Sequence, residues 1–254
     1  MYKEEYDLAV EAALKAGAYL KDKDLPRIDS QTGKDIKLSS DKKSEEIIIN
    51  ILRDTDIPIL SEECGVVGEK KASRVWIIDP LDGTANYWRG MKELACVSVA
   101  LWENGEPVLG VVNRFQQGEL FSGIVGEGAW MNGEVIHTST TSHISDAVLA
   151  TGFPVKRDYG SESLQSFIGQ VQKFKKVRML GAAAVMGAFV AAGRVDVYAE
   201  DQIMLWDIAA SSAIVKAAGG VADILPLESD QCICRLYANE SLYEEYNQLE
   251  SRVK

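Results

Sequence analysis

The residues of this chain that could do chemistry are carboxylates placed where strands end and helices begin. The most informative stretch, WIIDPLDGTANYW, spans residues 76–88. An apolar run leads into Asp79 and Asp82, and the pair Gly83-Thr84 follows at once. Carboxylates at a strand end suit a hard cation such as Mg²⁺, and backbone N–H groups at a helix start suit a phosphate. The stretch therefore offers metal and phosphate chemistry together, although Asp, Pro and Gly also favour an ordinary β-turn.

Four further acids occupy similar positions, at or just beyond expected strand ends or helix starts: Asp41, Glu62, Glu200 and Asp207. Ligands of layered α/β folds bind at strand ends. Acids gathered in one cleft repel one another unless cations lie among them. Two Mg²⁺ ions would relieve this repulsion and set up hydrolysis of a phosphate ester. Each acid also has a plainer interpretation, since Asp41 could simply cap a helix and Glu62 could simply be solvated.

Composition and missing motifs exclude several classes of function. The 254 residues are 46% hydrophobic and 26% charged, and the net charge of −11 argues against binding of nucleic acid through a broad basic surface. No apolar run approaches the ~18 residues of a membrane span. The four cysteines suggest no disulfide framework and the N-terminus resembles no signal peptide, so we expect a cytoplasmic protein. Because the sequence has no Cys-x₅-Arg nucleophile and no evident Ser-His pair, attack by metal-activated water is expected instead of a covalent intermediate.

The elements that position these acids alternate in type, which indicates a sheet with helices on more than one side. Periodicity predicts helices at residues 4–21, 42–54, 163–174, 181–192, 207–218 and 242–249. Strands are expected at residues 57–60, 75–78, 95–102, 108–112, 120–125, 148–150, 176–179, 195–198, 221–224 and 233–237. Asn-Gly pairs at residues 104–105 and 132–133 predict tight hairpin turns.

Several expected boundaries lie beside the candidate acids. Pro80 should end the strand that precedes it, because proline cannot donate to a ladder. The strand at residues 195–198 should end before Glu200 and Asp201. Asp41 should be the N-cap of the helix that follows it.

Two polar segments organise the chain at a larger scale. Residues 22–40 are expected to form a polar loop, and such a loop beside a site can act as a lid. The polar linker at residues 137–145 divides the chain into an α+β half, 1–140, and an α/β half, 141–254. We expect the two halves to form one catalytic unit.

Three motifs in this order resemble the signatures of the inositol monophosphatase family. They are SEE at residues 61–63, DPLDGTAN at 79–86, and WDIAA at 206–210 with AGG at 218–220. GFP at residues 152–154 and GAAAV at 181–185 extend the resemblance over nearly the whole chain. The resemblance implies a layered αβαβα sandwich, dependence on Mg²⁺, sensitivity to lithium and a homodimer.

The same resemblance implies a metal centre made of acids and one carbonyl group. Glu62, Asp79 and the Leu81 carbonyl would hold a first metal ion. Asp79, Asp82 and Asp207 would hold a second, and two or three Mg²⁺ ions are implied for each site.

The resemblance also assigns roles in catalysis and binding. Gly83 and Thr84 would present backbone N–H groups to the phosphate, and Thr84 and Asp41 would orient and deprotonate the attacking water. Ala183 and Glu200 would contact hydroxyl groups of the substrate. In full, catalysis falls to Asp41, Thr84 and Glu62, and substrate or phosphate binding to Asp82, Gly83, Thr84, Ala183, Glu200 and Asp207. Most metal ligands then belong to the first half, and Asp207 and the substrate contacts to the second.

The function implied is a Mg²⁺-dependent phosphatase for the monophosphate of a small polyol or sugar. A 3'(2'),5'-bisphosphate nucleotidase is the alternative, and fructose-1,6-bisphosphatase activity is a further one. A catalytically silent relative is less expected, because no metal ligand is missing. Leu38, Ala182 and Ala217 stand where the family usually has other residues, and they leave the identity of the substrate open.

Overall fold

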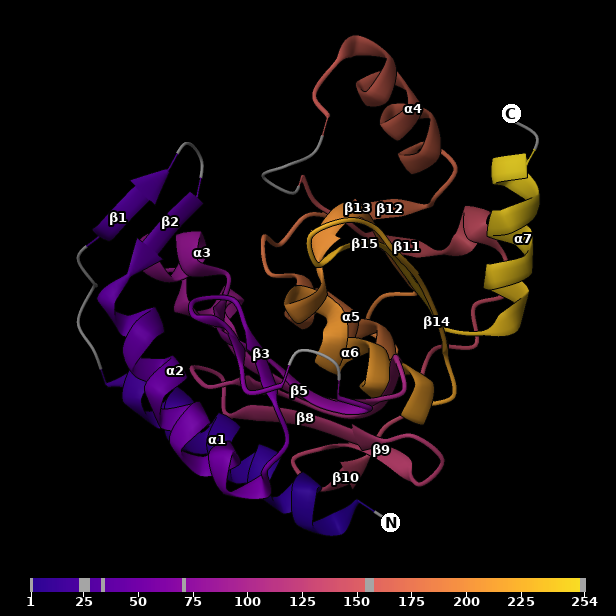
Figure 1. Cartoon of the computed structure of the whole chain (residues 1–254). Helices are drawn as coiled ribbons and strands as arrows, with labels where there is room; N and C mark the ends of the chain where they lie inside the picture. The colour runs from indigo at the N-terminus through magenta and orange to yellow at the C-terminus, as the bar shows by residue number, and fades with distance from the viewer. Residues whose placement is uncertain (1, 23–27, 33–34, 70–71, 154–157, 252–254) are drawn as a thin grey trace.

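Alternating layers of helix and sheet make up the computed structural model, which describes residues 2–22, 28–32, 35–69, 72–153 and 158–251 (Figure 1). Helices α1 (Lys3–Lys21) and α2 (Ser39–Leu52) cover the outer face of an eight-stranded sheet. Helices α5 (Ala183–Ala191) and α6 (Leu205–Ala217) lie between this sheet and a five-stranded one. Helices α4 (Ser161–Val171) and α7 (Glu240–Ser251) lie beyond the smaller sheet. This arrangement confirms the predicted αβαβα sandwich.

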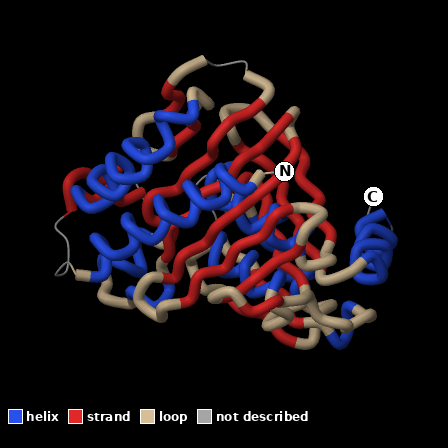
Figure 2. The backbone as a smooth tube through the Cα atoms, turned by 90° about the horizontal axis from the view of Figure 1, so that it is seen from below, coloured by secondary structure: helices blue, strands red, loops and turns tan. Residues whose placement is uncertain are grey.

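The larger sheet is built entirely from the first part of the chain. Its strands are ordered β10-β9-β8-β7-β6-β5-β3-β4, and all neighbours are antiparallel except β3 and β5. Figure 2 shows helices lying across these strands. The strands are β3 (Ile59–Ser61), β4 (Gly65–Val67), β5 (Arg74–Asp82), β6 (Cys96–Glu103), β7 (Glu106–Arg114), β8 (Glu119–Ile124), β9 (Gly128–Met131) and β10 (Glu134–Val135).

The smaller sheet comes from the second part of the chain and has the order β12-β11-β13-β15-β14. Strand β11 is parallel to both β12 and β13, whereas β15 is antiparallel to both β13 and β14. The strands are β11 (Val148–Ala150), β12 (Lys176–Arg178), β13 (Val197–Met204), β14 (Val221–Pro226) and β15 (Gln231–Tyr237).

Short helical segments complete the described chain. They are α3 (Thr84–Trp88) and the 3₁₀ segments Arg53–Thr55, Lys92–Leu94 and Ile144–Asp146. The predicted Asn-Gly turn between β6 and β7 is confirmed, since Asn104 and Gly105 both have positive φ. No helix among the described residues is both long and apolar enough to cross a membrane.

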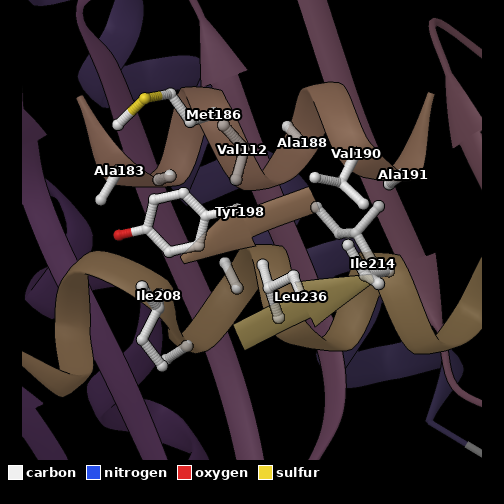
Figure 3. Packing of buried hydrophobic residues seen from close by; sticks show 14 of the residues in the cluster. Val112, Ala183, Met186, Ala188, Val190, Ala191, Tyr198, Ile208, Ile214 and Leu236 are labelled. Atoms are coloured by element: carbon white, nitrogen blue, oxygen red, sulfur yellow. The ribbon is translucent and has the colours of Figure 1, made fainter. Parts of the chain in front are cut away.

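The main core lies around α5 and α6, whose buried side chains pack against a sheet on either side. Figure 3 shows Val112 of the larger sheet and Tyr198 and Leu236 of the smaller sheet in one cluster with side chains of these helices. Helix α6 approaches the larger sheet closely at Gly110, where an added Cβ atom would lie 2.2 Å from the Ala210 carbonyl oxygen. This close packing fixes the start of α6, and therefore Asp207, relative to the larger sheet.

Three predicted boundaries were wrong, and each correction has a physical cause. Strand β5 continues through Pro80, because a bulge interrupts its pairing with β6 there and requires no N–H donor. Strand β13 continues past Glu200 for the same reason, since its register with β15 also shifts after that residue. Helix α2 begins at Ser39, so Asp41 lies inside its first turn and accepts a hydrogen bond of 2.9 Å from the Leu38 N–H.

The prediction that residues 22–40 form a loop was also wrong where the structure describes them. Strands β1 (Ile28–Thr32) and β2 (Asp35–Leu38) form an antiparallel hairpin that belongs to neither larger sheet. A two-stranded hairpin outside the layers can be polar on most of its surface, which conceals it from pattern analysis. Residues 23–27 and 33–34 of this segment lie outside the described residues.

Candidate active site

A cavity of about 380 Å³ opens where β5 and β13 meet the starts of α3, α5 and α6. It brings together all of the site residues predicted from the sequence except Asp41. The predicted residues on its wall are Glu62, Asp79, Leu81, Asp82, Gly83, Thr84, Ala183, Glu200 and Asp207. Residues more than 140 positions apart in sequence therefore share one concave surface, as the predicted constellation requires.

The bulge of β5 turns the two central acids toward this cavity and holds them there. Asp79 Oδ1 accepts a hydrogen bond of 2.9 Å from the Leu81 N–H, and Thr84 Oγ1 donates one of 2.9 Å to the Leu81 carbonyl. Ser44 of α2 donates one of 2.7 Å to the Pro80 carbonyl. The plain β-turn interpretation therefore does not describe the local backbone, which is a bulged strand as far as Asp82 and turns only at Gly83. The same bulge forms part of the cavity wall.

Gly83 is the residue that lets this turn enter α3. Its φ is +84°, and an added Cβ atom would lie 2.6 Å from the Leu94 carbonyl oxygen. A side chain would be strained by the backbone conformation and blocked by a backbone atom. Gly83 and Thr84 both line the cavity at this turn.

Asp82 links the larger sheet to the helical layer between the sheets. Its carboxylate accepts hydrogen bonds from the N–H groups of Ala183, at 3.2 Å, and Ala184, at 2.8 Å, in the first turn of α5. The Cys96 thiol lies 3.6 Å from Asp82 Oδ2 as a further, weak donor. A carboxylate at a helix N-terminus is stabilised by the orphan N–H groups and the helix dipole.

Asp207 lies in the first turn of α6, where its Oδ2 accepts a hydrogen bond of 3.3 Å from the Met204 N–H. Glu200 is 5% exposed and belongs to β13. Its carboxylate is packed against Gly152, where an added Cβ atom would lie 2.5 Å from Glu200 Oε1. Gly152 belongs to the GFP motif, so that motif makes room for the buried acid.

Burial raises the pKa values of the four predicted metal-binding acids, and repulsion by neighbouring carboxylates adds to the shift in Glu62, Asp79 and Asp207. Burial raises the pKa of Glu62 to about 8, and the neighbouring Glu63 carboxylate adds to the shift. Burial raises the pKa of Asp82 to about 6 against the opposing effect of its N–H donors. The pKa values of Asp79 and Asp207 lie well above their usual range, first through burial and then through repulsion by the other acids of the set.

Carboxylates with raised pKa values need protons or cations to neutralise them. Their donor atoms are all oxygens, which fits a hard divalent cation such as Mg²⁺ better than a softer ion. Within the described ranges, no group of three or more His, Cys, Asp and Glu side chains is already arranged to hold a metal ion. The cavity thus fits the ion by charge and donor type, whereas the individual coordination bonds remain a prediction.

Asp41 is the predicted site residue that the cavity wall does not include. It is 2% exposed and lies near enough to Glu62 for its charge to raise the Glu62 pKa. Asp41 is the third residue of α2 and not its N-cap, but its carboxylate still stabilises the helix start by accepting from the Leu38 N–H. The hydrogen bond to Leu38 does not test the predicted role of Asp41 in catalysis, which stays a prediction.

Lys37 and Gln202 line the cavity and were not predicted from the sequence. Lys37 Nζ lies 3.1 Å from Glu63 Oε2 and its charge lowers the Glu62 pKa. The alternation in DIKL could have indicated Lys37, because Leu38 is buried and its neighbour must face the other way. Gln202 lies in the bulge of β13, for which the sequence offers no pattern.

Comparisons with known proteins agree with this geometry. The model of the inositol monophosphatase family matches residues 1–230. "Nus factor SuhB" of Pasteurella multocida is 36% identical over 222 residues, which cover 85% of this chain and 83% of that protein. "Fructose-1,6-bisphosphatase/inositol-1-monophosphatase" of Thermotoga maritima is 38% identical over 198 residues, which cover 76% of this chain and 73% of that protein.

A solved structure is similar over almost the full length. The inositol monophosphatase of Anabaena (Nostoc) sp. PCC 7120 superimposes with a TM-score of 0.85 at 34% identity, covering 98% of this chain and 96% of that one. Members of the matched family are phosphatases that hydrolyse phosphoric monoesters. On the family match, the sequence identity and the shared fold, this chain belongs to the inositol monophosphatase family.

Proposed function

We propose that this phosphatase hydrolyses the monophosphate ester of a small polyol or sugar and depends on Mg²⁺. The observation that carries the proposal is the gathering of four acids with raised pKa values, Glu62, Asp79, Asp82 and Asp207, on one cavity wall. Structural ion pairs would neutralise such acids with Lys or Arg. Here Lys37 is the one basic side chain among the described residues of the wall. Most of the negative charge of the four acids therefore has no basic side chain on the wall to neutralise it, and a bound cation would do so.

The family resemblance supplies the residues that would hold two or three Mg²⁺ ions, and their common place on the cavity wall supports the assignment. Glu62, Asp79 and the Leu81 carbonyl would hold one ion, and Asp79, Asp82 and Asp207 another. When bound, Mg²⁺ supplies positive charge that polarises a phosphate ester and lowers the pKa of water. Asp79 would belong to both sets, so its charge matters most.

The chain's own groups would position the reactants around these acids. The Gly83 and Thr84 N–H groups would bind phosphate oxygens at the turn that enters α3. Thr84 Oγ1 donates to the Leu81 carbonyl, so its lone pairs are available to orient a water molecule. We propose that Asp41 acts together with Thr84 in accepting a proton from that water.

Glu200, which also lines the cavity, would accept hydrogen bonds from hydroxyl groups of the leaving group. Ala183 was predicted to share this role, but its N–H already donates to Asp82. Glu200 is therefore the stronger candidate for contact with hydroxyl groups.

Fructose-1,6-bisphosphatase activity is the second candidate, and Lys37 is the observation that favours it. A cation on the cavity wall could meet the second phosphate of a bisphosphate substrate. The printed name of the Thermotoga maritima relative includes both activities.

Several companion properties are also proposals. Lithium inhibition and a homodimer are implied by the family resemblance, and a cytoplasmic location is expected from the amino-acid sequence. Other relatives bear the name "Nus factor SuhB", but the net charge of −11 speaks against direct binding of a nucleic acid through a broad basic surface.

One purified preparation tests the proposed function. Phosphate release is measured with inositol 1-phosphate, fructose 1,6-bisphosphate, adenosine 3',5'-bisphosphate and p-nitrophenyl phosphate, with and without Mg²⁺. We expect Mg²⁺-dependent turnover that is fastest with a polyol or sugar monophosphate. Turnover that is equal in EDTA, or confined to the adenosine bisphosphate, would contradict the proposal.

A further inference from the structure

A second cavity, of about 520 Å³, opens between the β6–β7 turn of the larger sheet and the edge strand β14 of the smaller sheet, which lies beside α6 (Figure 1). It is larger than the active-site cavity, and among the described residues no side chain lines both cavities. Sites for small molecules typically have volumes of roughly 300 to 1,000 Å³. The second cavity therefore has the size of a separate ligand site.

The deeper part of its wall is apolar. Trp102 is 7% exposed, and its Nε1 donates a hydrogen bond of 3.3 Å to the Ala209 carbonyl, so the one polar atom of the ring is already satisfied. Burial raises the pKa of the Cys232 thiol to about 12, so this side chain carries no charge at neutral pH. Further apolar residues of the wall are Val75, Leu205, Ile224 and Leu227. Such a wall suits an aromatic or alkyl group.

The charged residues of the wall are mostly acids. Among the described residues they are Glu106, Lys216, Asp223 and Asp230. Lys216 Nζ lies 2.9 Å from Glu106 Oε2, so these two charges offset each other. Asp223 and Asp230 are exposed and form no ion pair with the part of the chain that the structure describes. Two negative charges beside an apolar wall complement a cation that has an apolar body.

The hairpin between β14 and β15 holds Asp230 in place. Ser229 and Asp230 both have positive φ in its turn. The Leu227 N–H closes the turn with a hydrogen bond of 2.8 Å to the Gln231 carbonyl. The Leu205 N–H, at the start of α6, donates one of 2.8 Å to the Asp230 carbonyl. This wall is therefore formed before a ligand arrives, and little ordering opposes binding.

We propose that this cavity binds an organic cation with an aromatic or alkyl body, at a site separate from the one that hydrolyses phosphate esters. The apolar body packs against Trp102 and Leu205, and the cationic group meets the carboxylates of Asp223 and Asp230. The same carboxylates repel phosphate and phosphate esters, so the substrates of the active site do not compete for this cavity.

Three probes of similar size test the charge requirement. They are 4-phenylbutylamine, 4-phenylbutanol and 4-phenylbutyrate, which are a cation, a neutral molecule and an anion at neutral pH. Binding is followed by NMR of the methyl groups, with Mg²⁺ present to occupy the acids of the active site. We expect the amine to bind with a Kd on the order of 1 mM and to shift the resonances of Leu205, Ile224 and Leu227. The resonances of Leu81, in the active site, should not move.

The other two probes and three variants give the comparison. The alcohol should bind more weakly than the amine, and the anion at least roughly tenfold more weakly. Changing Asp223→Asn and Asp230→Asn together removes both charges, and asparagine tolerates the positive φ of Asp230. The Kd of the amine should rise roughly fivefold in this protein, and that of the alcohol should not change. Ala222→Phe, on β14, should fill the cavity and abolish binding of all three probes.

Asp7→Asn, on an exposed position of α1, is the matched control and should leave every Kd unchanged. The melting temperature of each variant shows whether it is folded. The doubly substituted protein keeps the proposal testable if Ala222→Phe does not fold.

Three results would overturn the proposal. The first is equal affinity for the amine and the anion, or an unchanged Kd of the amine in the doubly substituted protein. The second is a shift confined to Leu81, which would place the amine in the active site. The third is a dimer, seen by sedimentation, that Ala222→Phe dissociates, because a second copy of the chain would then cover the cavity. None of these results depends on hydrolysis of a phosphate ester, so the proposed function stands or fails separately.

Discussion

The carboxylate of Asp82 accepts a hydrogen bond of 2.8 Å from the backbone N–H of Ala184. This bond joins the end of β5, in the larger sheet, to the start of α5, between the two sheets. The active-site cavity therefore depends on how the two parts of the chain pack together. The same carboxylate repels the other acids of the cavity and raises the pKa values of Asp79 and Asp207. Asp82 therefore stabilises the start of α5 but adds electrostatic repulsion within the cavity.

This double role gives the first prediction. Asp82→Asn keeps an acceptor for α5 but removes one buried charge, so repulsion in the cavity decreases. We expect the melting temperature in EDTA to stay level or rise, while turnover falls at least 100-fold. Thermal unfolding and phosphate release of the same sample check both effects. A large fall in melting temperature would show that the charge itself supports α5.

The raised pKa values predict how stability depends on pH. The pKa of Glu62 is about 8 in the folded protein, against about 4.5 ordinarily, so the folded state holds more protons than the unfolded state between these values. The free energy of unfolding without metal should be highest below about pH 4.5, as far as this group is concerned, and should fall as pH rises to about 8. Chemical denaturation in EDTA at several pH values measures it.

Asp79→Asn serves as the control for that slope, because it removes one of the repelling charges. The decline in stability with pH should be shallower in this variant. A wild-type stability in EDTA that increases steadily from pH 5 to pH 8 would contradict the assigned direction of the shifts.

Lys37 should have opposite effects on the two ligands of the site. Its ammonium group lies beside Glu63 and lowers the pKa of Glu62, so it competes with a cation and attracts an anion. In Lys37→Met we expect Mg²⁺ to bind roughly threefold more tightly and inorganic phosphate to inhibit more weakly. Calorimetry and inhibition kinetics measure the two affinities.

Lys42→Met is the matched control for Lys37, since Lys42 pairs with Asp29 on the surface of α2. It should change neither affinity. Weaker binding of both ligands in Lys37→Met would indicate a structural defect and would count against the proposed charge effect.

Gly83 gives a prediction about the turn itself. Gly83→Ala places a Cβ atom against the Leu94 carbonyl at a positive φ, so we expect a loss of about 2 kcal/mol or more in unfolding free energy. Gly118→Ala is the control, because Gly118 also has positive φ but nothing lies within 4 Å of its added Cβ atom. That variant should lose about 1 kcal/mol. Urea denaturation compares them, and equal losses would exclude the clash with Leu94.

The sequence was informative where chemistry and local structure depend on the same residues. Asp79, Asp82 and Gly83 were found because their order defines a turn and supplies carboxylates in the same few residues. The two bulges were missed because pairing with a distant strand creates them. Pro80 is accommodated because the bulge of β5 takes it out of the pairing with β6. Gln202 adopts its positive φ in the bulge of β13, beside the Glu200 carbonyl that accepts from Arg235. The hairpin of β1 and β2 was missed because most of its residues are polar, although Leu38 at its end is buried.

The central claim is that the cavity acids bind Mg²⁺, and a titration of the metal-free protein tests it most directly. The melting temperature is followed against Mg²⁺ concentration for the wild type and for Asp79→Asn. A ligand that binds only the folded state raises stability in proportion to the logarithm of its concentration above Kd. The account predicts that the wild-type melting temperature rises in this way and that Asp79→Asn loses most of the rise. A wild-type melting temperature that does not change with Mg²⁺ concentration, or the same rise in both proteins, would contradict the account.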